Sequence, residues 1–272
     1  MADDKTPPAI ASENLPATAS ENLPAVQGVD LEADAGSGME GISSKDLATP
    51  FLMVLQQLSP QLNKQKPEYI QGAEQGEFYN NVTKERSKTK ILIPCYYMRR
   101  FTEWRPRAKG GGMVADYGSN EECLAKTKKN ERGKDVTPDG NEISQAGTYF
   151  CLDYNEEHKS FEKVVVSLQS TQLKKARRWN TLASSIQLTS AKTGKIFTPA
   201  LYYMSYMATT VPESNDSGSW YGWKIEQYKP VPQLPNGDQL YMAAKEFREA
   251  VVKGIVKVAP PPESPDDKDI PF

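Results

Sequence analysis

Apolar and polar residues follow two different periods along this chain, and each period predicts a different kind of element. Five segments are dense in β-branched, aromatic and apolar residues, which predicts strands; they are residues 90–104, 148–154, 161–168, 196–209 and 219–228. Apolar residues recur at helical intervals in residues 172–188 and 239–253, which predicts two amphipathic helices. Ser170 or Thr171 is the expected cap of the first helix.

Two further segments complete the expected order of elements. Leu52, Leu55 and Leu58 are spaced as in a helix, although Pro60 should end it. Residues 116–146 are polar and rich in glycine, which indicates an excursion with one short helix. Strands, helix, strands and helix in this order predict an α+β fold with a mainly antiparallel β-sheet core and two or three helices. An OB-fold barrel remains the alternative, because such barrels commonly hold single strands of nucleic acid.

The two ends of the chain differ in composition from its centre. Residues 1–48 contain no aromatic side chain and repeat the sequence of residues 11–17 at 19–25, so we expect a disordered N-terminal arm. Three consecutive prolines, residues 260–262, end the expected folded part, and residues 259–272 are expected to form a flexible acidic tail. No apolar run approaches the ~20 residues that a membrane span needs, and no signal peptide opens the sequence, so we expect no membrane partner.

Charge is distributed unevenly along these three parts. The arm carries nine acidic residues and two lysines, and the tail carries four acidic residues and one lysine. Because the whole chain has a net charge of −2, residues 49–258 carry +8. A basic body between acidic ends is typical of proteins that bind polyanions, although a lysine-rich solvated surface gives the same count.

The densest group of candidate binding residues lies in the first long strand. It combines aromatic rings, which can stack on bases, with arginines, which can contact phosphates; its members are Tyr96, Tyr97, Arg99, Arg100, Phe101, Trp104, Arg105 and Arg107. Alternation along a strand would place Tyr97, Arg99, Phe101 and Arg105 on one surface. Any single ring is better explained as core, but the cluster as a whole favours binding.

A second candidate patch lies on the first expected helix. It consists of Lys174, Lys175, Arg177, Arg178 and Trp179. At 100° per residue, the side chains of Lys174, Arg177 and Arg178 fall on one side, with Trp179 near the other. Like charges at this spacing repel one another, which a phosphate partner would relieve. An ordinary solvated helix face explains the patch equally well.

The C-terminal end carries the most specific short motif. Acidic residues lead to an apolar end with a free carboxylate, a combination that a partner protein can bind through an apolar pocket and a cation; the residues are Asp266, Asp267, Asp269, Ile270, Pro271 and Phe272. This ending resembles that of bacterial and phage single-stranded DNA-binding proteins, although Lys268 interrupts the acidic run. The resemblance implies docking onto replication and repair proteins.

Other short sequence segments between residues 48 and 190 resemble segments of tailed-phage proteins that bind single-stranded DNA. They are residues 58–62, 69–73, 78–83 and 93–97, together with the stretch to Arg107. Some members of that group act as cofactors of a phage RNA polymerase, and that resemblance implies a fold other than an OB barrel.

Catalytic chemistry finds little support in the sequence. The single histidine, His158, lies in a polar turn, and the three cysteines are too widely spaced for a zinc site, so we expect no metal, no cofactor and free thiols, buried at Cys95 and Cys151. Asp139 followed by Glu157 and Lys159 fits a loose nuclease pattern that would bind Mg²⁺. Such spacing arises often by chance, so a Mg²⁺-dependent nuclease is the less favoured reading.

The sequence therefore predicts a non-enzymatic protein of the cytoplasm of an infected bacterium. Residues 49–258 would bind single-stranded DNA without sequence preference, and the tail would recruit replication or recombination proteins. Recruitment of a phage RNA polymerase to melted promoters is the alternative role. Whether the chain forms a homo-oligomer is left open.

Overall fold

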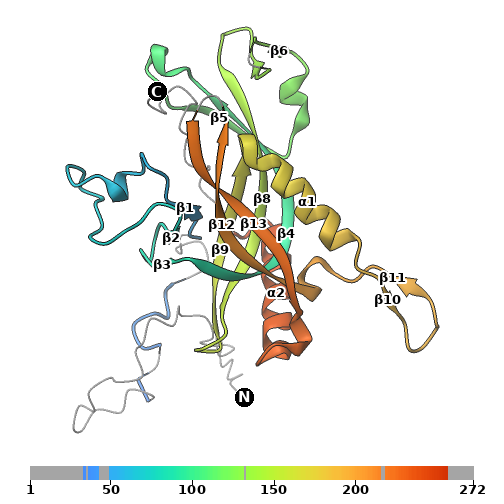
Figure 1. Ribbon diagram of the computed structural model, residues 1–272. Coiled ribbons are helices and arrows are strands. Elements are labelled where there is room, and N and C mark those ends of the chain that lie inside the picture. The colour runs from blue at the N-terminus through green and yellow to red at the C-terminus, as the bar shows by residue number, and fades with distance from the viewer. Residues whose placement is uncertain (1–32, 35, 43–48, 132, 216–217, 257–272) are drawn as a thin grey trace, which may run out of the picture.

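An eight-stranded antiparallel sheet forms the centre of the fold, in a computed structural model that describes residues 33–34, 36–42, 49–131, 133–215 and 218–256. Its strands follow the order β13-β12-β4-β8-β7-β6, with β5 paired to β4 and β9 paired to β8. The sheet curls strongly (Figure 1). The strands are β4 (Thr89–Trp104), β5 (Met113–Gly118), β6 (Lys128–Lys129), β7 (Asp135–Val136), β8 (Glu142–Asn155), β9 (Ser160–Gln169), β12 (Met204–Asn215) and β13 (Gly218–Pro230).

Within the described residues, two small sheets and six short 3₁₀ helices accompany the large sheet. A three-stranded sheet contains β1 (Leu52–Val54), β2 (Phe78–Asn80) and β3 (Arg86–Ser87), and a hairpin contains β10 (Leu188–Thr189) and β11 (Ile196–Phe197). The 3₁₀ helices are η1 (Pro60–Leu62), η2 (Arg107–Lys109), η3 (Glu121–Leu124), η4 (Ser170–Gln172), η5 (Leu201–Tyr203) and η6 (Val231–Gln233). The α+β class with a mainly antiparallel sheet is confirmed.

Each face of the large sheet is covered by one α-helix. Neighbouring residues of a strand point to opposite faces, so Tyr149 of β8 packs with α1 (Leu173–Ser184) while Phe150 packs with α2 (Gly237–Val252). Trp179 enters the first core from α1, and Phe247 enters the second from α2. Because both faces are apolar, the central strands read as nearly continuous hydrophobic runs.

The fit of α1 against β8 is unusually close. The indole of Trp179 stacks on the ring of Tyr149 with centroids 4.1 Å apart and an interplanar angle of 24°. The Tyr149 hydroxyl donates to the carbonyl oxygen of Ala176 or to Oδ1 of Asn180, each 2.8 Å away. Gly147 lies directly under the helix, where an added Cβ would come within 2.7 Å of the Ala176 Cβ. The helix reaches this depth because position 147 has no side chain.

Strand β13 forms one edge of the large sheet, and two glutamine side chains satisfy part of its backbone. Gln56 donates to the Tyr221 carbonyl (2.9 Å) and accepts from the Tyr221 N–H (2.8 Å). Gln172 accepts from the N–H of Trp223 at 3.0 Å. An open edge strand can pair with another chain, and these amides occupy bonding positions that such a chain would use.

Three sequence-based expectations about elements were wrong. Residues 50–62 form β1 and η1 rather than a helix, because Leu52 is needed as a buried residue of a strand paired with β2. Residues 196–209 are not one strand: β11 ends at Phe197, and Pro199 precedes η5 and β12. The first helix ends at Ser184 instead of residue 188, and its N-cap is Gln172, with no side-chain cap bond.

Other expectations hold within a few residues. Strand β4 begins one residue before the predicted start and ends at the predicted Trp104. Helix α2 follows Asn236, whose φ of 51° is the left-handed conformation that asparagine tolerates. Cys95 and Cys151 are buried free thiols, and burial raises the pKa of both. Among the described residues, no helix is long and apolar enough to cross a membrane.

We predict that Gly147→Ala lowers the free energy of unfolding by about 1–3 kcal/mol, since the new methyl overlaps Ala176. Ala176→Gly alone should cost about 1 kcal/mol through lower helix propensity. The double variant should be more stable than Gly147→Ala, because the overlap is gone. Urea denaturation of the four proteins measures this coupling, and strictly additive losses would contradict the close fit.

Candidate nucleic-acid interface

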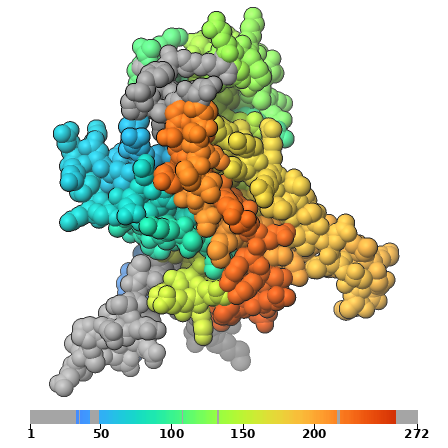
Figure 2. All heavy atoms as spheres, viewed as in Figure 1, coloured from blue at the N-terminus to red at the C-terminus, as the bar shows by residue number. Residues whose placement is uncertain are grey.

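The outer side of α1 carries three positive charges. Lys174, Arg177 and Arg178 are all exposed, and none forms an ion pair with another described residue. Ala176 and Trp179 point the other way and are 1% exposed. We call these three residues the cationic face of α1. Figure 2 shows this helix open on the surface of the molecule, between the β12–β13 hairpin and the β5–β7 excursion (residues 113–136).

Lys175, the fourth basic residue of α1, has a structural role. Its ammonium pairs with the carboxylate of Glu213 on β12, which also accepts from Nε2 of Gln172 (3.1 Å) and Nε1 of Trp220 (3.0 Å). Burial alone would raise the pKa of Glu213, but these hydrogen bonds outweigh it and lower the pKa. This carboxylate therefore fixes the start of α1 to the β12–β13 hairpin.

Arg99 lies on the face of the sheet that α1 covers. Its register partner on β8 is Gly147, the residue under Ala176, so Arg99 lies beside the N-terminal half of α1. Its guanidinium pairs with Glu121 of the excursion at 2.7 Å, and both side chains are more than half exposed. Arg105 is exposed just beyond β4, and its described neighbours include no ion-pair partner. Arg107 lies in η2.

Arg100 points to the opposite face and is committed to the fold. Its side chain is 8% exposed, and its guanidinium donates two hydrogen bonds to Asp116 of β5. Burial would raise the pKa of Asp116, but the Arg100 hydrogen bonds and charge outweigh it, so the pKa is lowered. A guanidinium held by two bonds at a buried site is not available to phosphate.

The predicted stacking rings differ in accessibility. Phe101 and Trp179 are each 1% exposed and belong to the core. Tyr97 is half-buried against Tyr149, with centroids 4.8 Å apart, while Tyr96 packs on Phe150 at the other face. Trp104 is partly exposed at the end of β4. Tyr97, Arg99 and Phe101 therefore share a face, as alternation requires, but a base can reach at most the rim of Tyr97 on that face.

One property of the region was not among the sequence-based candidates. Residues 163–212, from β9 through α1 to β12, contain no aspartate or glutamate and seven basic residues. With 35 acidic residues in 272, a segment of this length would carry about six. A count of acids in a sliding window reveals this run, whereas a search for basic clusters alone does not. The cationic face is therefore free of nearby acids from its own segment.

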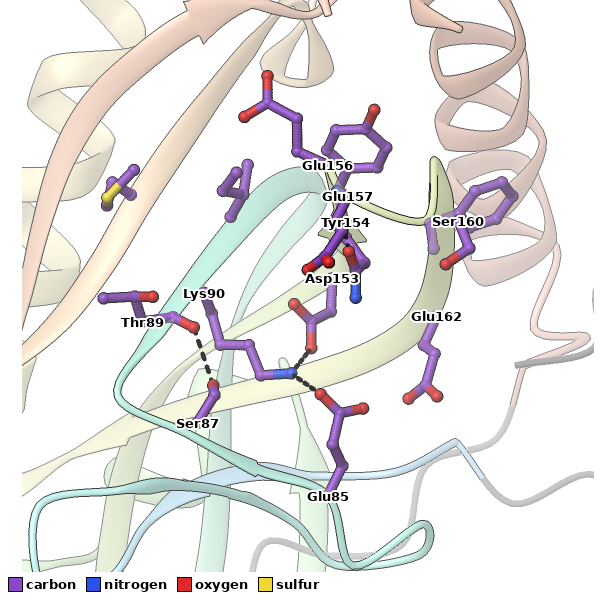
Figure 3. Close-up of a pocket in the computed structure, with 14 residues that line it drawn as sticks. Glu85, Ser87, Thr89, Lys90, Asp153, Tyr154, Glu156, Glu157, Ser160 and Glu162 are labelled. Carbon is purple, nitrogen blue, oxygen red and sulfur yellow. Dashed lines mark hydrogen bonds and ion pairs between the residues drawn. The ribbon is translucent and has the colours of Figure 1, made fainter. Parts of the chain in front are cut away.

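A pocket at the C-terminal end of β8 is acidic, in contrast to the basic outer side of α1. It has a volume of about 380 Å³, and its lining includes five carboxylates and one lysine. Figure 3 shows the Lys90 ammonium between Asp153 (2.8 Å) and Glu85 (2.9 Å). Burial opposes the charged lysine, but these two carboxylates outweigh it and raise the pKa of Lys90. The remaining acids, among them Glu162, make this pocket unsuitable for phosphate.

The residues of the nuclease pattern do not meet. Asp139 lies in the turn before β8, and Glu157 and Lys159 lie in the turn after it. A strand of 14 residues spans roughly 45 Å, so these side chains cannot hold one metal ion together. Nowhere in the described part of the chain do three or more His, Cys, Asp or Glu residues gather as a metal site.

The acidic tail lies outside the described residues, and so do most of the residues of the N-terminal arm. The predicted partner-binding residues Asp266 to Phe272 therefore have no structural account here. The boundaries expected at residues 48 and 258 rest on sequence.

Comparison with known proteins identifies a family. The model of the family described as Pam3 phage gp34-like protein matches residues 18–257, so the chain belongs to that family and is a phage protein. The chain matches no curated protein and no solved structure.

We predict that Arg100→Ala lowers the free energy of unfolding by roughly 1–3 kcal/mol at neutral pH, because Asp116 loses its buried partner. Arg99→Ala, which removes an exposed pair, should cost less than about 1 kcal/mol.

The pH dependence provides a second check of the Arg100 pair. Asp116 has a lowered pKa in the folded state, so its contribution is complete above the unfolded pKa of about 3.9 and is lost as the pH falls towards the folded pKa. The difference between wild type and Arg100→Ala in denaturant titrations should therefore shrink below about pH 4. A constant difference would mean that Arg100 acts only through packing.

Proposed function

For this member of a phage protein family, we propose sequence-tolerant binding of single-stranded DNA, with the cationic face of α1 as the main phosphate contact. The carrying observation is that Lys174, Arg177 and Arg178 are exposed, close together and unpaired with other described residues. Three like charges within two turns of one helix repel each other by a few tenths of a kcal/mol per pair. A phosphate backbone lying along the helix would turn this repulsion into attraction and release counterions.

Arg99 supports an extension of this surface towards β4. Its ion pair with Glu121 is exposed on both sides, and such pairs contribute about 0–1 kcal/mol. A phosphate can therefore displace Glu121 at little cost. On the same face, the accessible rim of Tyr97 offers a limited stacking surface to a base, whereas the partly exposed Trp104, five residues after Arg99 on β4, points to the opposite face. Stacking on rings requires unpaired bases, which favours a single strand over a duplex as the ligand.

Recruitment of protein partners is the second half of the proposal. The apolar residues Ile270, Pro271 and Phe272 behind Asp266, Asp267 and Asp269 suit an apolar pocket with neighbouring cations that contact the acidic side chains. Its resemblance to the endings of single-stranded DNA-binding proteins supports partners from phage replication or recombination. Under this proposal the chain is a binding protein and catalyses no reaction.

We predict that replacing Lys174, Arg177 and Arg178 by alanine together weakens binding of a labelled single-stranded oligonucleotide roughly ten- to hundred-fold at low salt. The plot of log K against log salt should become shallower by about 2, since each lost contact with a single strand removes about 0.7. Fluorescence anisotropy over a salt series, without Mg²⁺, measures both quantities.

The matched control removes three charges from the other face of the sheet. Lys245, Arg248 and Lys253 are exposed on or next to α2, so their triple alanine variant has the same net charge as the α1 variant. It should retain wild-type affinity apart from a small general charge effect. Equal loss in the two variants would show that only net charge matters, and no binding by wild type would overturn the proposed function.

We also predict that deletion of residues 263–272 leaves single-strand affinity unchanged or tighter, because four acidic residues leave the protein. The same deletion should abolish association with phage replication, recombination or transcription proteins in pull-downs from infected cells. Retained association would place the partner surface elsewhere. A variant with only Phe272→Ala tests whether the apolar end, rather than the acidic charge, is responsible.

A further inference from the structure

The β10–β11 hairpin projects from the body directly after α1. The helix ends at Ser184, and β10 begins at Leu188. Leu188 pairs with Phe197 and Thr189 pairs with Ile196, and Gly194 closes the loop with a φ of 67°, a conformation that glycine adopts without strain. Figures 1 and 2 show the hairpin standing away from the sheet at the C-terminal end of α1. We call residues 188–197 the hairpin arm.

The arm exposes large apolar side chains. Ile196 is 66% exposed and Phe197 is 47% exposed, and every residue from 191 to 198 is exposed. A two-stranded hairpin is marginally stable by itself. Ile196 and Phe197 belong to neither hydrophobic core of the described residues. Their exposure together on a projecting hairpin indicates a contact with another molecule.

The charge of the arm restricts what that molecule is. Lys192 and Lys195 are exposed, and neither pairs with another described residue. The arm lies within the acid-free residues 163–212 and so continues the charge of α1. Lys195 directly precedes β11 and is two residues from Phe197, so a cation and an aromatic ring occur close together along the arm.

We propose that the hairpin arm is a second contact segment for the same single strand, with Phe197 stacking on a base and Lys192 and Lys195 contacting phosphates. This inference rests on the proposed function and extends it along the molecule. A strand following α1 covers about 18 Å of helix, equivalent to roughly five nucleotides at about 3.4 Å each. A longer strand then meets the arm, whose ring and lysines provide the combination that single-strand sites use.

A second copy of the chain is the competing occupant, and charge disfavours it. Symmetric dimers bring the same patch of each subunit together. Arm against arm would place four lysines in one contact without an acidic residue from either arm. A phosphate backbone, by contrast, neutralises the lysines and leaves its bases for the ring.

The test is a series of single-stranded oligonucleotides from about 5 to about 30 nucleotides, titrated against the full-length protein at one salt concentration. Wild-type affinity should rise with length beyond the part that α1 binds. Phe197→Leu should bind the shortest oligonucleotide as wild type does and bind long ones about five- to hundred-fold more weakly, as loss of one stacked base implies.

Two variants separate stacking from general effects. Phe197→Tyr keeps an aromatic ring and should restore the long-oligonucleotide affinity. Met242→Ala removes an exposed apolar side chain, 52% exposed, from α2 on the other face and should change no length. Circular dichroism of the variants should match wild type, since residue 197 lies outside both hydrophobic cores.

The outcomes distinguish the two proposals. If the α1 triple variant loses binding while Phe197→Leu matches wild type at all lengths, the inference about the arm is wrong and the proposed function stands. If wild type binds no oligonucleotide, both are overturned. If Phe197→Leu changes the oligomeric state in analytical ultracentrifugation and leaves the length dependence intact, the arm contacts a second copy and the inference is overturned.

Discussion

The stacking of Trp179 on Tyr149 is the contact on which the arrangement of the candidate interface depends. It fixes the rotation of α1, and Gly147 lets the helix approach until Ala176 rests on the β8 backbone. Once those two residues face inward, the helical repeat leaves Lys174, Arg177 and Arg178 no orientation except outward. The exposed charge is thus a consequence of core packing, and the same residues that stabilise the fold determine what the surface presents.

Charge is separated along the length of the sheet as well as along the sequence. The part of β8 near Gly147 lies under α1, whose cationic face points outward, whereas the C-terminal end of β8 contributes to the pocket around Lys90, Asp153 and Glu85. A polyanion approaching the molecule would be attracted at one end and repelled at the other. This polarity orients a charged chain before any specific contact forms, and a uniformly basic surface could not do so.

The sequence predicts most of the central sheet, because long strands buried on both faces leave unmistakable apolar runs such as β4. It fails where tertiary contacts override local pattern: Leu52 has helical neighbours by spacing but belongs to a strand paired with β2. Within the candidate site, helical spacing placed the α1 charges correctly. It could not show that Arg100 is held by Asp116, because residues 100 and 116 belong to different strands and nothing local links them. Nor could it distinguish a core ring such as Phe101 from an exposed one.

The glutamine bridge from Gln56 to Tyr221 joins residues that are 165 positions apart. Ribosomes add roughly 5–20 residues per second, so the first partner exists for about ten seconds or longer before the second is synthesised. In the same way, Phe78 is synthesised well before Trp223, its ring partner in the folded protein, with ring centroids 4.7 Å apart. During translation the first strands therefore remain without their final neighbours, and the nascent chain carries exposed apolar surface until the last hairpin emerges. The contacts that join the first strands to the last hairpin can therefore form only near the end of synthesis.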